Sequence, residues 1–228
     1  MHTLEFVASL WFQLAIVAGW LGIVVLTAEW LYFRQTTDPE IARKIVHIGT
    51  GNVILVAWWL QMPAWIGMGA AIVAGTIAII SYKLPILPGI NSVGRKSFGT
   101  FFYAVSIGVL IAWFWPLQQP YYAAIGILIM TWADGFAAII GQSFGKHPYQ
   151  IWGIKKSWEG SLTMFLISYI VTCSILLGIQ GVILPTFLVP LVVAFAATTL
   201  EVFSKLGIDN LTVPIASAAI CFFLNQSL

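Results

Sequence analysis

Charged residues divide this sequence into long apolar stretches, and their spacing predicts its secondary structure. Five long stretches contain no Asp, Glu, Lys or Arg. A membrane-spanning helix needs about 20 apolar residues, so the three longest stretches each have room for two helices joined by a turn. The pattern therefore predicts eight spans, with approximate bounds 8–32, 45–61, 64–82, 98–116, 121–140, 160–179, 182–200 and 211–227.

Composition supports a membrane protein and excludes two other classes. Apolar residues make up 60% of the 228 positions and charged residues 8%, whereas soluble domains have roughly 45–50% and about 25%. A disordered chain would need low hydrophobicity and high charge. The net charge of +2 gives no reason to expect a nucleic-acid partner. We expect residues 1–228 to form one all-α, polytopic domain embedded in the lipid bilayer.

The basic residues predict how this domain is oriented. All ten fall in the first, third, fifth and seventh loops: Arg34, Arg43, Lys44, Lys83, Arg95, Lys96, Lys146, Lys155, Lys156 and Lys205. Loops rich in Lys and Arg stay on the cytoplasmic side of a membrane. The distribution therefore predicts that these charged loops are cytoplasmic and that both termini are non-cytoplasmic.

Two basic segments at span starts each allow two interpretations. In the first loop, Arg43 and His47 share one helix face if the segment is helical. In the third loop, residues 94–100 read Gly-Arg-Lys-Ser-Phe-Gly-Thr and contain Arg95 and Lys96. Each segment is either a basic membrane anchor or a site where cations and backbone N–H groups bind phosphate.

Asp134 is the most conspicuous charged residue, because it lies inside, or at the cytoplasmic end of, an otherwise apolar span. An ionisable residue at such a depth is costly and is a functional candidate by default. The structural alternative is an ion pair with a loop cation. Small residues such as Gly135 and Gly141 follow it and would let another helix or a ligand approach closely.

The rest of the fifth loop combines lysines with a carboxylate. Lys146, Lys155 and Lys156 suit phosphate oxygens, because a lysine is a compact point charge. Glu159 follows the candidate N-cap Ser157 by two residues. It is therefore either a first-turn acid favoured by the helix dipole or a functional carboxylate.

The carboxylates suggest a metal. Asp134 and Glu159 together would suit Mg²⁺, which takes one or two carboxylates plus substrate phosphates. Glu201 and Asp209 bracket the seventh loop, where Glu201 and Lys205 are either a helical ion pair or part of the site. Cations and carboxylates on one face indicate Mg²⁺-assisted chemistry on a nucleotide's phosphates. No P-loop pattern is present, since residues 141–147 read GQSFGKH.

Four segments together resemble the polyprenol kinase family, which includes dolichol kinase and phytol kinase. They are RKIVHIG at 43–49, GRKSFGT at 94–100, ADGFAAIIGQSFGKH at 133–147 and KKSWEGS at 155–161. The similarity covers about residues 43–210 and is greatest to the phytol kinase branch. It implies a CTP-dependent kinase that phosphorylates the primary hydroxyl of an isoprenoid alcohol such as phytol, in phytol salvage toward tocopherol. It also implies a CTP-binding region made of Asp134, Gly135, Lys155, Lys156, Ser157, Glu159 and Gly160.

The leading hypothesis is therefore a membrane-embedded CTP:isoprenoid-alcohol kinase. In this hypothesis Asp134 and Glu159 are catalytic and hold Mg²⁺, while the proton acceptor is Asp134, Glu159 or Glu201. The expected nucleotide-binding residues are Gly135, Lys146, Lys155, Lys156, Ser157, Gly160, Arg95 and Lys96. Further candidates without an individual role are Arg43, His47, Glu201 and Asp209.

Two alternatives stay open. The same loops look like those of phosphatidate cytidylyltransferase, which would make the chain a CDP-lipid synthase. A small membrane transporter is the other alternative, although its ionisable residues would be expected near the bilayer midplane and not at one face.

Overall fold

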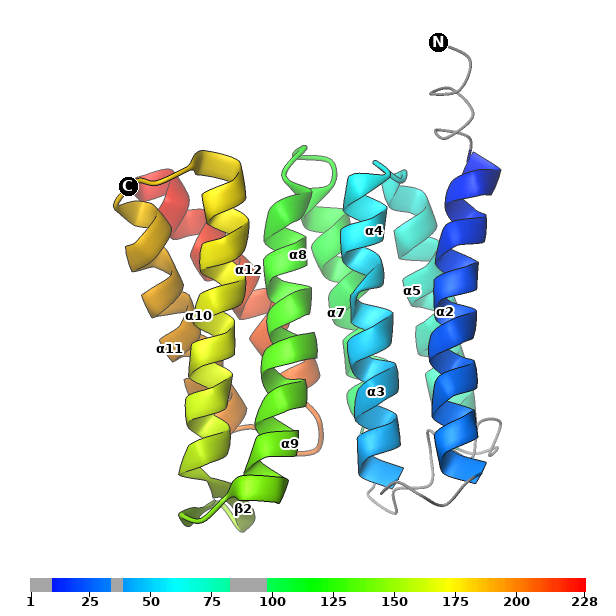
Figure 1. Ribbon diagram of the computed structural model, residues 1–228. Coiled ribbons are helices and arrows are strands. Elements are labelled where there is room, and N and C mark those ends of the chain that lie inside the picture. The colour runs from blue at the N-terminus through cyan, green and yellow to red at the C-terminus, as the bar shows by residue number, and fades with distance from the viewer. Residues whose placement is uncertain (1–9, 34–38, 83–97) are drawn as a thin grey trace.

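The chain folds into a bundle of long helices. The computed structural model describes residues 10–33, 39–82 and 98–228. The helices run side by side along one common direction (Figure 1). They are α2 (Leu10–Phe33), α3 (Pro39–Gly51), α4 (Val53–Trp59), α5 (Ala64–Ser81), α7 (Gly99–Phe114), α8 (Pro120–Leu128), the π-helix η1 (Ile129–Ala133), α9 (Asp134–Phe144), α10 (Trp158–Gln180), α11 (Pro185–Val202) and α12 (Asp209–Ser227).

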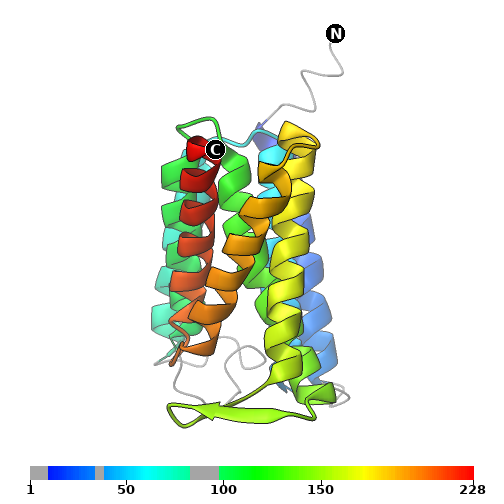
Figure 2. The same cartoon turned by 90° about the vertical axis from the view of Figure 1, so that its left-hand side faces the viewer.

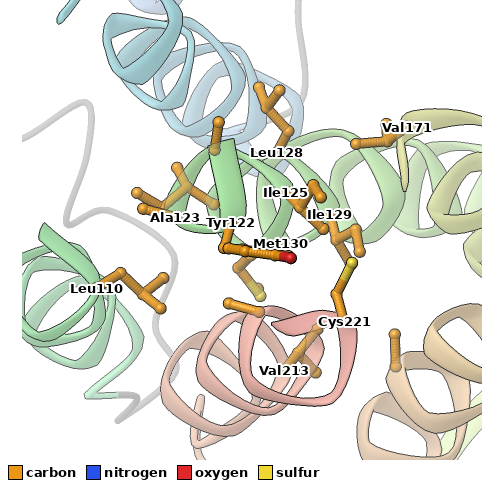
Figure 3. Close-up of a cluster of buried hydrophobic side chains, with 14 of the residues drawn as sticks. Leu110, Tyr122, Ala123, Ile125, Leu128, Ile129, Met130, Val171, Val213 and Cys221 are labelled. Atoms are coloured by element: carbon orange, nitrogen blue, oxygen red, sulfur yellow. The ribbon is translucent and has the colours of Figure 1, made fainter. Parts of the chain in front are cut away.

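One continuous helical rod, made of α8, η1 and α9, forms the centre of the bundle. It packs against α7, α10 and α12, and its other side contacts α3 and α4. Apolar side chains fill the space around it, with Met130 of the rod near Val213 of α12 and Leu110 of α7 on the side of Ala123 (Figure 3). The rod is therefore the most buried helix and fixes the positions of the others.

A close approach of backbones holds α12 against this rod. A Cβ atom at Gly126 would lie 2.3 Å from the carbonyl oxygen of Pro214. No side chain fits at such a distance, so glycine is required where the two helices cross.

The described helices are those of a membrane protein. Five are long and apolar enough to cross a bilayer: α2, α5, the central rod, α10 and α11, while α7 is apolar but shorter. Large apolar side chains such as Trp11, Ile72 and Phe195 point outward and are mostly exposed. Lipid is the solvent that tolerates such faces. The expectation of an all-α membrane protein is thus confirmed.

A β-hairpin joins α9 to α10, and the sequence analysis had treated this segment only as a loop. Strand β1 (Pro148–Ile151) pairs antiparallel with β2 (Ile154–Ser157). Trp152 and Gly153 form the two-residue turn, with φ of 51° and 82°. Positive φ at both positions matches the turn that best suits the twist of paired strands. The all-helical expectation therefore needs this small correction.

The hairpin defines one end of the bundle. Figure 2 shows it lying across the lower ends of the helices, while the C-terminus lies at the opposite end. The Trp152 ring packs on Phe203, with ring centroids 5.4 Å apart, and Lys205 Nζ lies 5.4 Å from the Trp152 ring centroid. These contacts attach the turn to the connection between α11 and α12. We call this end of the molecule the hairpin end.

Candidate active site

Two ion pairs, one buried and one partly buried, lie at the hairpin end. The first joins Lys44 of α3 to Asp134, the first residue of α9, with 2.5 Å between Nζ and Oδ2. Lys44 is 7% exposed and Asp134 is 8% exposed. Removing one partner of such a pair would leave an uncompensated charge in an apolar environment. The two residues therefore constrain each other's position tightly.

The second ion pair connects the hairpin to α11. Lys156 of β2 lies 2.5 Å from the carboxylate of Glu201. The same ammonium group also donates to the carbonyl oxygen of Glu201. Each side chain is 14% exposed. Helix α11 ends at Val202, so Lys205 lies outside it and cannot form a helical ion pair with Glu201. Glu201 pairs with Lys156 instead.

Asp209 joins these two pairs into one group. It interacts electrostatically with Asp134, Lys44 and Lys156, and Glu201 interacts with both Asp134 and Asp209. Asp209 is the first residue of α12, and its carboxylate accepts hydrogen bonds from the backbone and side chain of Asn210. We define Lys44, Asp134, Lys156, Glu201 and Asp209 as the charged cluster.

Local backbone geometry contributes to the position of Asp134. The five residues directly before it form η1, a π-helical segment inside an otherwise α-helical rod. Such insertions change the direction in which following side chains point and are frequent at functional sites. Here the segment ends where the charged cluster begins.

A polar network supports η1 from the neighbouring helices. His47 Nε2 lies 3.3 Å from the carbonyl oxygen of Met130, and the His47 ring packs on Tyr103 with centroids 4.3 Å apart. The Tyr103 hydroxyl lies 3.1 Å from the Thr131 hydroxyl. Trp132 donates to the Asn52 side chain at 2.9 Å. Since polar groups in an apolar interior need partners, this network gives η1 a defined place against α3 and α7.

The start of α10 forms a separate polar group. Ser157 caps the helix by accepting a hydrogen bond from Gly160 N at 3.2 Å, which confirms the expected N-cap. Glu159 lies 2.7 Å from the largely exposed His147. Helix α10 packs closely against the small residues of α9. A Cβ at Gly160 would lie 3.0 Å from the Ala137 carbonyl oxygen.

The structure brings together some of the predicted residues and separates others. Asp134, Lys156, Glu201 and Asp209 meet in the charged cluster, whereas Glu159 pairs with His147. Lys146 and Lys155 are exposed on the hairpin and its approach. Gly135 faces Ile48 of α3, since a Cβ there would lie 2.9 Å from that side chain.

The remaining predicted residues are at or beyond the edge of the described part. Arg43 belongs to α3, which confirms that it shares a helix with His47, but its side chain lies outside the described residues. Arg95 and Lys96 also lie outside the described residues.

Sequence reasoning missed three contributors to this region. Lys44 was only one of several loop cations, yet it is the buried partner of Asp134. Tyr103 and Asn52 make polar contacts inside apolar spans. A polar side chain in such a span is a candidate for a functional role. The hairpin gave only a weak signal, a possible two-residue turn at Trp152-Gly153, because the flanking runs PYQI and IKKS do not alternate in polarity.

The carboxylates of the cluster fit a metal that is shared with a phosphate ligand. Among residues 10–33, 39–82 and 98–228, no three His, Cys, Asp or Glu side chains converge closely enough to hold a metal ion by themselves. Mg²⁺ usually takes one or two protein carboxylates and completes its shell with water and substrate phosphates. Asp134, Glu201 and Asp209 match that kind of donor set.

Fold and site together define a class: a helical membrane protein with a partly buried charged cluster at one end of an apolar bundle. The chain is 52% identical over 213 residues to a phytol kinase of Synechocystis sp., covering 93% of this chain and 91% of that protein. It is 30% identical over 179 residues to phytol kinase 1 of Arabidopsis thaliana, with coverage of 70% and 56%. It is also 28% identical over 217 residues to the farnesol kinase of the same plant, with coverage of 84% and 67%.

Neither a protein-family model nor a solved structure matches the chain. The relatives nevertheless decide the assignment, because the first match extends over nearly the full length of both proteins. The chain belongs to the phytol kinase family. The resemblance carried by its four sequence segments is thereby confirmed.

Proposed function

We propose that this protein is a kinase that transfers the γ-phosphoryl group of CTP to the primary hydroxyl of an isoprenoid alcohol, phytol in particular. The observation that carries the proposal is the charged cluster at the hairpin end of an apolar bundle. Such a site offers polar groups to a nucleotide and lipid-facing surface to the alcohol. The kinase names of the relatives supply the reaction.

The cluster offers groups of both signs for this reaction. Lys44 and Lys156 would neutralise phosphate oxygens on the transferring group. Asp134, with Glu201 or Asp209, would hold Mg²⁺, which when bound supplies further charge neutralisation between the phosphates. Glu159, the other predicted metal ligand, lies at the base of the hairpin beside His147, where it would act on the nucleotide side of the site.

The transfer itself needs only positioning and one proton acceptor. The alcohol oxygen forms a bond to the γ-phosphorus as the bond from this phosphorus to the β-phosphate oxygen breaks, and CDP leaves. The hydroxyl proton passes to a carboxylate of the cluster. Two rigid ion pairs suit this task, because catalysis of phosphoryl transfer depends mainly on alignment and electrostatic stabilisation.

The position of a radioactive label tests the reaction. Membranes containing the protein are given phytol or phosphatidate with CTP labelled at the γ or the α phosphate. Label from the γ position should appear in phytyl phosphate. Label from the α position in a lipid would instead indicate a CDP-lipid synthase and refute the proposal. Replacing CTP by ATP or UTP tests the donor in the same assay.

We also propose that the eight helical ranges are eight spans, that the hairpin end is cytoplasmic, and that both termini are on the other side. The basic loop residues of the sequence support this orientation. Gln150→Cys on the hairpin and Val182→Cys in the connection between α10 and α11 test it, because both positions are exposed. In intact cells a membrane-impermeant maleimide should label only Val182→Cys; labelling of only Gln150→Cys would reverse the orientation.

A further inference from the structure

A long groove lies between α5 and α7, apart from the charged cluster. Its volume is about 450 Å³. The lining residues extend from Met68 to Ile79 on α5 and from Phe101 to Ala112 on α7. At 1.5 Å per helical residue, the groove is about 16 Å long. It therefore follows much of the length of two adjacent helices and has the proportions of a site for an extended chain.

The lining determines which kind of ligand fits. The surface of the groove is almost entirely apolar, and small residues (Ala71, Gly75, Ala104 and Gly108) alternate with larger ones along it. Thr76 is the polar side chain among them, and its hydroxyl donates to the Ile72 carbonyl oxygen of its own helix. A hydrocarbon chain is complementary to this apolar lining. The small residues leave gaps between the larger ones, and these gaps suit the methyl branches of such a chain.

One end of the groove approaches the charged cluster. Phe101 and Ile79 mark this end, and α7 begins just before Phe101, at Gly99. There the backbone N–H of Phe98 donates to the carbonyl oxygen of Leu206 at 3.2 Å. Leu206 belongs to the connection between α11 and α12, which leads directly into Asp209. A chain lying in the groove would thus have its end group beside the segment that carries part of the cluster.

We propose that the groove between α5 and α7 binds the hydrocarbon chain of the isoprenoid alcohol, with the hydroxyl at the Phe101 end. This inference rests on the proposed kinase function. It adds that the groove is the surface that selects the length of the alcohol's hydrocarbon chain. The start of α7, next to the Phe101 end of the groove, contacts the connection that leads to Asp209. The groove is long enough for several isoprene units, and its lining offers no polar partner that would favour another ligand class.

Filling the groove tests the proposal. A Cβ at Gly75 would lie 3.7 Å from the Phe101 ring and 3.8 Å from Ala104, so the side chain of Gly75→Leu would occupy the groove. Gly69→Leu is the matched control on the same helix, because a Cβ there meets nothing within 4 Å and Gly69 does not line the groove.

We expect Gly75→Leu to lower kcat/KM for phytol at least about tenfold, in line with the effect of one misplaced methylene in an apolar pocket. Activity on a short alcohol such as geraniol should stay within about twofold, which shows that the variant is folded. Gly69→Leu should match the unmodified protein with both alcohols. Equal losses for both alcohols, or no loss for phytol, would overturn the proposal.

Photo-cross-linking separates this proposal from the proposed function. An isoprenoid alcohol with a diazirine on its chain is irradiated with the protein without nucleotide. Labelling of α5 and α7 that phytol competes away, and that Gly75→Leu abolishes, supports the groove even if no phosphorylation occurs. Labelling elsewhere, or competition by an equal concentration of fatty acid, would show that ordinary bilayer chains fill the groove and would refute the assignment.

Discussion

The buried pair of Lys44 and Asp134 permits a test that separates stability from catalysis. The perturbation is Lys44→Met, which keeps the length of the side chain but removes its charge. Asp134 is 8% exposed, so the variant leaves a carboxylate in an apolar environment without its 2.5 Å partner. We expect both a large loss of stability and a loss of phosphorylation.

The size of the effect follows from burial. Breaking a buried ion pair by removing one partner costs about 3–5 kcal/mol. Replacing both charges by apolar residues of similar volume is often neutral. The double variant Lys44→Met/Asp134→Leu should therefore recover most of the stability that Lys44→Met loses, but it should remain inactive because the carboxylate is gone.

The assay combines two readouts on the purified protein in detergent. Denaturant titration gives the free energy of unfolding for the unmodified protein, both single variants and the double variant, and label transfer from γ-labelled CTP gives the activity. The loss in the double variant should be much smaller than the sum of the two single losses, each of about 3–5 kcal/mol. Additive losses in the double variant would mean that the pair does not stabilise the fold, and full activity in Lys44→Met would remove Lys44 from the proposed site.

Three further predictions concern individual residues. Lys156→Met should reduce phosphorylation about a hundredfold or more, because it removes a cation and releases the Glu201 carboxylate; near-normal activity in the label assay would contradict its role. Gly51→Ala should lower the yield of folded protein in size-exclusion chromatography, since its Cβ would lie 2.1 Å from the Thr131 hydroxyl; an unchanged yield would contradict this packing. Ser157→Ala should cost about 1 kcal/mol in denaturant unfolding, whereas Ser157→Asp should keep the cap; equal stability of the two variants would contradict the capping role.

The sequence predicted the helices better than their contacts. Long runs without charge determine where apolar helices begin and end, and α5 and α10 closely match the expected ranges 64–82 and 160–179. The hairpin was missed because its lysines looked like loop residues. Its turn needs a positive φ at Trp152. A bulky residue rarely adopts such a φ, so a tryptophan at this position does not suggest a turn.

The partners of the charged residues were beyond the reach of sequence patterns. Lys44 and Asp134 are 90 positions apart, and Lys156 and Glu201 are 45 apart. Hydropathy gives the length of a helix and not its neighbours, so several cations were equally plausible partners for Asp134. Only the packing of α3 against the central rod, and of α11 against α10 and α12, decides which lysine meets which carboxylate.

The arrangement of charge and apolar surface explains why one bundle can serve two unlike substrates. Charged groups inside a bilayer are costly, and here two lysines and three carboxylates are gathered in one cluster at the hairpin end. The groove between α5 and α7 is apolar and ends beside the α11–α12 connection that leads into Asp209. A nucleotide and an alcohol would therefore approach the same point from water and from lipid. In this arrangement the cluster determines the chemistry, and the groove determines which alcohols reach it.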